Sequence, residues 1–114
     1  MKQITAWVRA GMVNKLVDAL EKANSGDFIL VEARGIVQGL PGDSYRFSMD
    51  LGERFEPMVR MEVVCRPEDE AALVDAVRSA VTTGRKGDGM IFVTTVDAAI
   101  RISDGSSGPA ALNR

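Results

Sequence analysis

The chain has 114 residues, a net charge of -2 and a pI near 5.1, so we expect one domain without the positive field that attracts nucleic acid. It contains one cysteine and no histidine, which argues against a disulfide framework, a multi-cysteine zinc site and histidine-based catalysis. A non-enzymatic protein without a metal site is therefore expected.

The beginning of the chain, "MKQITAWVRAG", lacks the apolar core of a signal peptide. No stretch reaches the roughly 18 apolar residues that a membrane-spanning helix needs. Together with the single cysteine, these features favour a cytoplasmic location.

The first third of the chain predicts a strand, a helix and a second strand. Residues 2–9 alternate in polarity, with Ile4, Ala6 and Val8 on one face, as in a half-buried strand. Residues 12–23 change to the helical spacing of apolar side chains and stop at "NSGD", where Gly26 suits a left-handed cap. The segment "FILVEARG", residues 28–35, then predicts the second strand.

Residues 36–56 contain three glycines and one proline and show no sustained period. They predict a long loop, either without regular structure or with a hairpin at its base. Loops of this length in compact domains usually carry function, although an insertion without function is the alternative. Arg46 and Arg54 in this loop are either partner contacts or solvated charges.

The second half repeats the pattern. Residues 58–65 alternate as a strand, and Pro67 with acidic neighbours predicts a helix start, the helix running to about Thr82. After a glycine-rich loop, "MIFVTTV" predicts a strand and "AIRIS" a short extra one. We expect the tail, residues 104–114, to be flexible.

The resulting order predicts an α+β fold, the ferredoxin-like βαββαβ arrangement with a short extra C-terminal strand and two helices on one sheet face. A faint repeat supports it, since "LVDAL" at 16–20 and "LVDAV" at 73–77 occupy the middle of each helix. The other sheet face would carry apolar side chains, namely Trp7, Phe28, Leu30 and Val64 or their alternates. Pairing with other subunits would cover that face.

The glycine loop "GRKGDG", residues 84–89, has three glycines in six positions. It is neither a Walker A motif nor a dinucleotide fingerprint, because it lies between a helix and a following strand. Successive glycines let amide groups converge on an anion, and Arg85 and Lys86 add positive charge. The alternative is purely structural: a cap at Gly84 and a turn at Asp88–Gly89.

These elements, with "TGRKGDGMIFV" and "AIRI", make the chain resemble PII signal-transduction proteins over about residues 1–103. The resemblance implies a homotrimer of ferredoxin-like subunits that binds adenine nucleotides in the clefts between subunits. It also implies that residues 36–56 correspond to the T-loop, through which these proteins signal to a protein target such as a transporter or an enzyme.

The resemblance also implies roles for individual residues. The glycine loop would wrap the phosphates, two strands would supply the base and ribose contacts, and one arginine would reach in from the neighbouring subunit. The implied nucleotide-binding residues are Gly35, Glu62, Val64, Gly84, Arg85, Lys86, Gly87, Asp88, Gly89 and Arg101, and the implied partner-binding loop residues are Gln38, Tyr45, Arg46 and Arg54.

Two departures from the family pattern concern phosphate binding. Met90 stands where nitrogen-signalling members have a lysine, and Ser103 where they have a second arginine. With two cations fewer, ADP or AMP is expected as the effector rather than ATP, with no cofactor tightly bound. Met58 and Leu51 replace the T-loop lysine and the modified tyrosine, so neither 2-oxoglutarate sensing nor uridylylation is expected.

Two other functions remain open. Met90 and Ser103 also fit a structural trimer with a degenerate nucleotide site that binds its partner constitutively. An acylphosphatase-like hydrolase would use Arg9 and Asn14, but the glycine loop is then in the wrong place. Cys65 is expected to be a small buried apolar group. Met49, Met58, Met61 and Met90 are expected to serve in packing and not as metal ligands.

Overall fold

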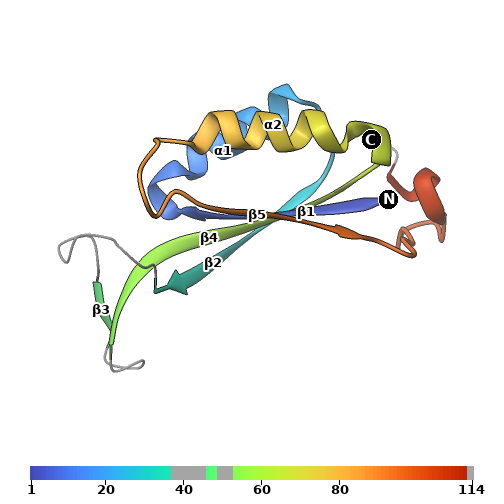
Figure 1. The fold of residues 1–114 in the computed structure, drawn as a ribbon. Helices are drawn as coiled ribbons and strands as arrows, with labels where there is room; N and C mark the ends of the chain where they lie inside the picture. Colours follow the sequence, from blue (N-terminus) through green and yellow to red (C-terminus); the bar gives the residue numbers. More distant parts are fainter. Residues whose placement is uncertain (37–45, 49–52, 113–114) are drawn as a thin grey trace.

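Two helices lie across one face of an antiparallel sheet in the computed structural model, which describes residues 1–36, 46–48 and 53–112 (Figure 1). The elements follow the predicted βαββαβ order with an added hairpin strand, so the ferredoxin-like α+β fold is confirmed. They are β1 (Lys2–Arg9), α1 (Val13–Lys22), β2 (Phe28–Gly35), β3 (Arg46–Ser48), β4 (Glu53–Cys65), α2 (Glu70–Val81) and β5 (Gly89–Thr95). Short 3-10 turns, Ala10–Met12 and Pro67–Asp69, lead into the helices.

The main sheet has the strand order β2-β4-β1-β5, with every neighbouring pair antiparallel. Its two central strands, β1 and β4, are far apart in the chain but pair over the full length of β1, from Lys2 opposite Cys65 to Arg9 opposite Met58. The outer strands are β2 and β5. The 36–56 segment follows the end of β2, and the glycine loop precedes the start of β5.

The core lies between the helices and the sheet. The alternating residues of β1, Ile4, Ala6 and Val8, are all buried, as their period predicts. They meet one apolar stripe from each helix, so the burial of each large side chain contributes roughly 1.5–3 kcal/mol. The other members of this core are Leu16, Leu20, Val59, Met61, Val63, Cys65, Leu73, Val77 and Val81.

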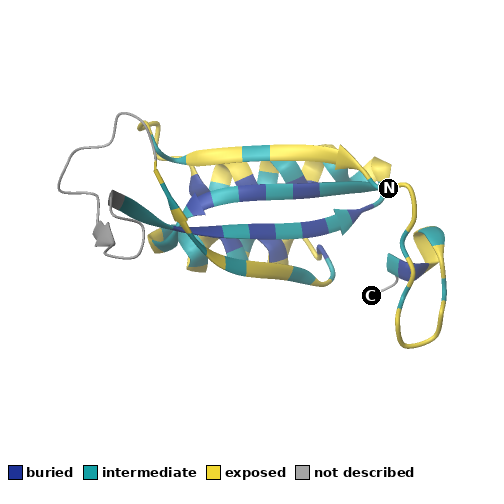
Figure 2. Ribbon diagram, turned by 90° about the horizontal axis from the view of Figure 1, so that it is seen from below, coloured by how far each residue is buried: buried dark blue, intermediate teal, exposed yellow. Residues whose placement is uncertain are grey.

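The opposite face of the sheet carries no helix among the described residues (Figure 2). Trp7 and Val64 lie on this open face, as predicted. Phe28 and Leu30 do not, because they pair with the core residues Val63 and Met61 and so share the helix side. Their alternates on β2 take that place on the open face. Figure 2 shows β5 as largely exposed and β2 as partly exposed.

The segment between β2 and β4 ends earlier than the loop predicted at 36–56. Strand β4 already begins at Glu53, and Arg46–Ser48 pairs with Glu53–Phe55 as a hairpin. The hairpin that the sequence left open is therefore present, and Arg46 and Arg54 lie on its two strands. This pairing leaves no signal in hydrophobic period. Gln38 and Tyr45 lie outside the described residues.

The short extra strand expected at 99–103 is wrong. This segment makes one isolated bridge, Ile100 opposite Ser107, because the chain turns back on itself too soon for a longer ladder. The tail then forms a 3-10 helix, Gly108–Leu112, whose Ala111 is buried. The tail thus has defined local structure, while its mobility stays a prediction.

Candidate functional site

The glycine loop joins α2 to β5 and is held together by one carboxylate. Asp88 Oδ2 accepts hydrogen bonds from the amides of Thr83 and Gly84, at 2.7 and 3.0 Å. Asp88 Oδ1 accepts from the Thr83 hydroxyl and, at 3.1 Å, from Nη2 of Arg9 at the end of β1. The aspartate therefore fastens the beginning of the loop to the central strand of the sheet.

This bonding stabilises the ionised form of Asp88. The Thr83 side-chain hydrogen bond, followed by the bonds from the Thr83 and Gly84 amides and Arg9, lowers the pKa of Asp88. The carboxylate is thus ionised at neutral pH but is offset by the guanidinium beside it. A negative charge that is satisfied in this way opposes a bound phosphate less than a free carboxylate would.

Part of the amide concavity predicted from the sequence is used by the loop itself. The amides of Thr83 and Gly84 bond Asp88, and that of Arg85 bonds the Thr83 hydroxyl at 3.3 Å. Among the described residues, no hydrogen bond uses the amide of Gly87 or Lys86. These two amides form the part of the loop that is free to bind an anion.

The cations of the loop are available as well. The side chains of Arg85 and Lys86 are exposed, and neither makes an ion pair within the described part of the chain. They lie beside the free amides in sequence and on the outside of the turn. The loop therefore offers a positive, partly unsatisfied surface at one end of the sheet.

The three glycines of the loop have separate reasons. Gly84 and Gly87 have φ of +76° and +88°, the left-handed region that other residues enter at a cost. Gly89 has φ of +120°, and a Cβ there would lie 1.8 Å from the carbonyl oxygen of Trp7. The triple-glycine composition thus follows from the sharp turn and from close approach to β1, before any ligand is considered.

Gly35 lies at the same end of the sheet as the glycine loop. It is the last residue of β2, opposite Glu56, and Gly89 opens β5 opposite Val8. Figure 1 shows the end of β2 and the loop before β5 at the end of the sheet from which the 36–56 segment extends. Two of the predicted groups of nucleotide residues, Gly35 and 84–89, are therefore gathered at one end of the molecule.

Glu62 and Val64 lie on the open face, in the half of β4 that leads away from this end. Glu62 is paired with Arg60, Nε to Oε1 at 3.0 Å. The Arg60 guanidinium also covers the Trp7 ring, 5.9 Å from its centroid. The cluster places one ion pair and one aromatic face beside the apolar edges of the open sheet, where a base or a neighbouring subunit would meet them.

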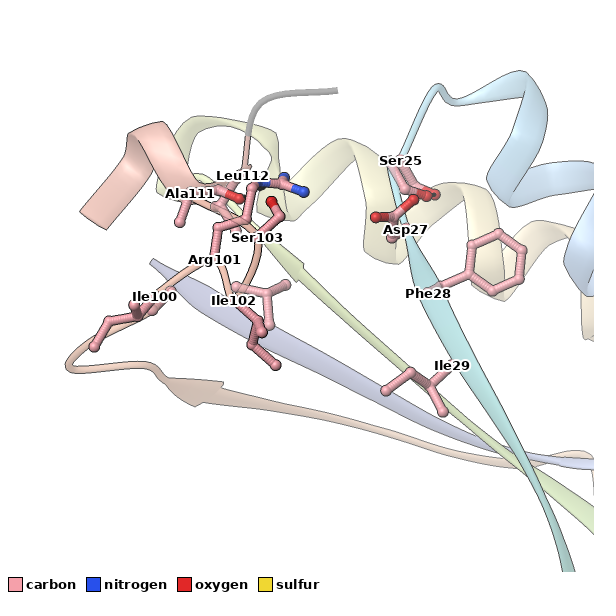
Figure 3. Close-up of a pocket in the computed structure, with 13 residues that line it drawn as sticks. Ser25, Asp27, Phe28, Ile29, Ile100, Arg101, Ile102, Ser103, Ala111 and Leu112 are labelled. Carbon is pink, nitrogen blue, oxygen red and sulfur yellow. Dashed lines mark hydrogen bonds between the residues drawn. The ribbon is translucent and has the colours of Figure 1, made fainter. Parts of the chain in front are cut away.

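Arg101 lies at the far end of the sheet, in a separate hollow of about 610 Å³ (Figure 3). The walls of the hollow come from the start of β2, from Val64 and from the C-terminal segment. They are formed by Ser25, Gly26, Asp27, Phe28, Ile29, Val64, Ala99, Ile100, Arg101, Ile102, Ser103, Ala111 and Leu112. Arg101 Nη2 donates a 2.6 Å hydrogen bond to the carbonyl of Ala111 in this wall.

One chain therefore does not bring all the predicted nucleotide residues together. The glycine loop lies where β1 ends, next to Val8, whereas β5 ends opposite Lys2 and leads on to Arg101. Six strand residues separate these ends, roughly 20 Å, which is further than an arginine side chain reaches. Gly35 and 84–89 lie at one end of the sheet, on its two outer strands, while Val64 and Arg101 line the hollow at the other end.

Sequence reasoning missed several residues at these two ends. The roles of Arg9 and Thr83 depend on contacts with Asp88, and the role of Ala111 depends on a contact with Arg101. The Arg9 and Ala111 contacts link residues 79 and 10 positions apart. A threonine five residues before an aspartate was a visible local signal, but the other two contacts required the sheet register and the folded tail.

The residues that depart from the family pattern have clear positions. Met90, the second residue of β5, lies on the open face opposite Trp7 and is 59% exposed, so it does not pack within the single chain. Met58, Met61 and Cys65 are buried, as predicted. Ser103 lies at the rim of the Arg101 hollow.

In the described ranges, no group of three or more acidic, histidine or cysteine side chains could hold a metal ion. Within those same residues, no helix has the length and apolar character needed to cross a membrane.

Comparison with known proteins gives a consistent result. The sequence profile of one family, described as "Nitrogen regulatory protein P-II", matches residues 1–106. A nitrogen regulatory protein P-II of Rhizobium meliloti is 32% identical over 108 residues, covering 95% of this chain and 96% of the relative. Nitrogen regulatory protein P-II 1 of Methanothermobacter thermautotrophicus is 36% identical over 114 residues, covering 98% and 97%. That of Bradyrhizobium diazoefficiens is 34% identical over 109 residues, covering 95% and 96%.

Proposed function

Since the chain belongs to the nitrogen regulatory protein P-II family of non-enzymatic signal-transduction proteins, we propose that it is a homotrimer that binds an adenine nucleotide between subunits. The nucleotide would regulate a protein target, a transporter or an enzyme, through the segment that includes Gln38, Tyr45, Arg46 and Arg54.

One observation carries this proposal: the two halves of the expected site lie at opposite ends of one protomer. The glycine loop and Gly35 lie at one end, and Arg101 at the other. A second copy of the chain, packed against the open face, can bring its own Arg101 to the first copy's glycine loop. The exposed apolar residues of that face supply a reason for the copies to associate.

The charge of the loop supports ADP or AMP as the effector. The unused amides at Lys86 and Gly87 and the exposed Arg85 side chain can meet one or two phosphates. Met90 adds apolar surface where a further cation would help a third phosphate. A charge-assisted hydrogen bond is worth roughly 1.5–3 kcal/mol, so the absence of a cation there lowers affinity for ATP more than for AMP.

Nucleotide binding would act on the 36–56 segment through its base. Gly35 ends β2 beside the hairpin of β3 and β4, so a ligand held by Gly35 and the glycine loop touches both the sheet and the start of this segment. Binding can then shift the population of conformations that a target recognises.

Calorimetry with ATP, ADP and AMP, paired with light scattering of the purified protein, tests the proposal. We expect a trimer that binds ADP or AMP in the micromolar range and ATP more weakly. A monomer, or a trimer that binds none of the three, would contradict nucleotide regulation.

The alternative, a trimer with a degenerate site and constitutive partner binding, rests on Met90 and Ser103. The double variant Met90→Lys, Ser103→Arg distinguishes the two. Appearance of ATP binding in the variant, with none in the parent, supports the degenerate site, whereas nucleotide binding by the parent excludes it.

A further inference from the structure

We propose that the C-terminal tail of this chain is an autoinhibitory latch that holds Arg101 away from a nucleotide bound between subunits. This inference rests on the proposed function, because it concerns how the same site is regulated. The latch consists of residues 104–112, which fold back on the segment that carries Arg101.

The main chain around Arg101 is closed by the tail. The amide of Arg101 donates to the Ser106 carbonyl at 2.8 Å, and the amide of Gly105 donates to the Arg101 carbonyl at 2.8 Å. The amide of Gly108 donates to the carbonyl of Ala99 at 3.0 Å. Three backbone hydrogen bonds thus tie both sides of Arg101 to residues that follow it.

The side chain of Arg101 is held by the same tail. Its Nη2 donates a 2.6 Å hydrogen bond to the carbonyl of Ala111, near the end of the 3-10 helix. The last carbonyls of a helix carry partial negative charge and lack partners within it. Like a phosphate oxygen, the Ala111 carbonyl oxygen therefore accepts a hydrogen bond from the guanidinium group, but with a smaller negative charge.

The direction of the side chain shows that it is turned inward. Ile100 and Ile102, on either side of Arg101, are 69% and 101% exposed, whereas Ala111, its acceptor, is 7% exposed. Figure 3 shows the Arg101 head group directed toward Ala111 and Leu112, while Ile100 and Ile102 point away from them. The segment thus presents its isoleucines outward and its cation to its own tail.

A second arginine steadies the latch from outside the site. Arg66, just after β4, donates from Nη2 to the Pro109 carbonyl at 3.4 Å. This contact lies on the 3-10 helix and not in the hollow that contains Arg101. It offers a way to loosen the tail without altering any residue placed in the nucleotide site.

The two partners of Arg101 compete for the same group. Arginine binds phosphate best with two adjacent N–H groups of its planar fork, and the Nη2 end of this fork is occupied by the tail. Nη2 carries two N–H groups, and a nucleotide that takes the one now bonded to Ala111 must displace that carbonyl. Release of the tail would then accompany binding, and removal of the tail would favour binding.

The test is calorimetry with ADP on the full-length protein and on a variant that ends after Ser107. Because one charge-assisted hydrogen bond no longer has to be broken, we expect ADP to bind the shortened protein about tenfold more tightly. A variant ending after Leu112, which keeps the Ala111 carbonyl, is the matched control and should bind as the full-length protein does. Arg66→Gln should shift affinity in the same direction as the shorter truncation, to a smaller extent.

Equal or weaker binding by the protein ending after Ser107, with full-length protein that binds ADP, overturns the latch and leaves the proposed function intact. Binding only after truncation supports both. Absence of binding in both proteins overturns both. Hydrogen exchange adds a second measurement: on addition of ADP, amides at 105 and 108 should exchange faster, and unchanged protection in the ADP complex also overturns the latch.

Discussion

At the residue scale, the glycine loop combines strain, close contact and charge in six positions. Gly89 approaches the backbone of β1 so closely that no side chain fits. The carboxylate of Asp88 accepts hydrogen bonds from amides of the loop itself. The glycine and aspartate that suggested a phosphate site are therefore already explained by the structure of the loop. The amides of Thr83, Gly84 and Arg85 are used by the loop itself, so the anion-binding surface is smaller than the motif implies.

Gly89→Ala should be strongly destabilising. The added Cβ would overlap the Trp7 carbonyl, and φ of +120° is unfavourable for alanine, so we expect a loss of about 3–5 kcal/mol in the free energy of unfolding. Gly105→Ala is the matched control, since φ is +73° there but no atom lies within 4 Å of the new Cβ. It should cost only about 1–2 kcal/mol. Urea denaturation measures both, and equal losses would show that the contact with Trp7 does not matter.

Asp88 gives the loop a pH dependence. Its pKa in the folded protein is lowered below the ordinary 3.8, first by the Thr83 side chain. The stability that the ionised carboxylate contributes is therefore fully present above pH 3.8 and is lost as pH falls through the lower folded value. We expect Asp88→Asn to be less stable than the parent at pH 7 and the difference to shrink below pH 4. Thermal unfolding from pH 7 to pH 2.5 checks this, and a difference that stays constant with pH would contradict it.

At the element scale, the helices and the sheet depend on one shared apolar layer. Strand β1 contributes every second residue to it, and each helix contributes one stripe. The helices and strands were visible in the sequence because the spacing of their apolar residues is a local pattern. Strands β2 and β5 keep an exposed face, because the helices cover only one side of the sheet.

Leu20→Ala in α1 tests this layer. Leu20 is fully buried, so its truncation should leave a cavity and cost about 2–5 kcal/mol. Glu21→Ala, the next residue on the exposed side of the same helix, should change stability by less than about 0.5 kcal/mol. Denaturant unfolding followed by circular dichroism measures both changes. Similar losses for the two variants would mean that α1 does not pack on the sheet as described.

At the scale of the whole molecule, the open face of the sheet is the unpartnered surface. Rows of paired residues cross it from one outer strand to the other: Ile29, Glu62, Thr5 and Phe92 form one such row. The two ends of this row, Ile29 and Phe92, are large apolar side chains that are 61% and 51% exposed, and a second copy of the chain could cover them. The proposed trimer would bury this face and complete the nucleotide site.

Phe92→Asp should therefore dissociate the proposed trimer. Phe92 lies on the open face and is 51% exposed in the single chain, so a charge there would be costly only if another subunit covers it. Ala72→Asp, on the exposed side of α2, is the control and should leave the assembly unchanged. Light scattering reports the mass of each variant. A trimeric Phe92→Asp protein that retains the mass of the parent would place the interface elsewhere.

The sequence by itself determined the two helices, the four strands of the main sheet, the fold class and the family, because hydrophobic period and the glycine loop are local features of neighbouring residues. Its assignment of Gly35, Asp88 and Arg101 to a nucleotide site stays a prediction. Tertiary structure alone decided what these residues touch: Asp88 meets Arg9 across 79 positions, and Arg101 meets Ala111 in a tail expected to fray. Pairing of β3 with β4 and the absence of a strand at 99–103 were likewise decided by long-range geometry. Such contacts depend on how strands align in space, and local sequence carries no record of that alignment.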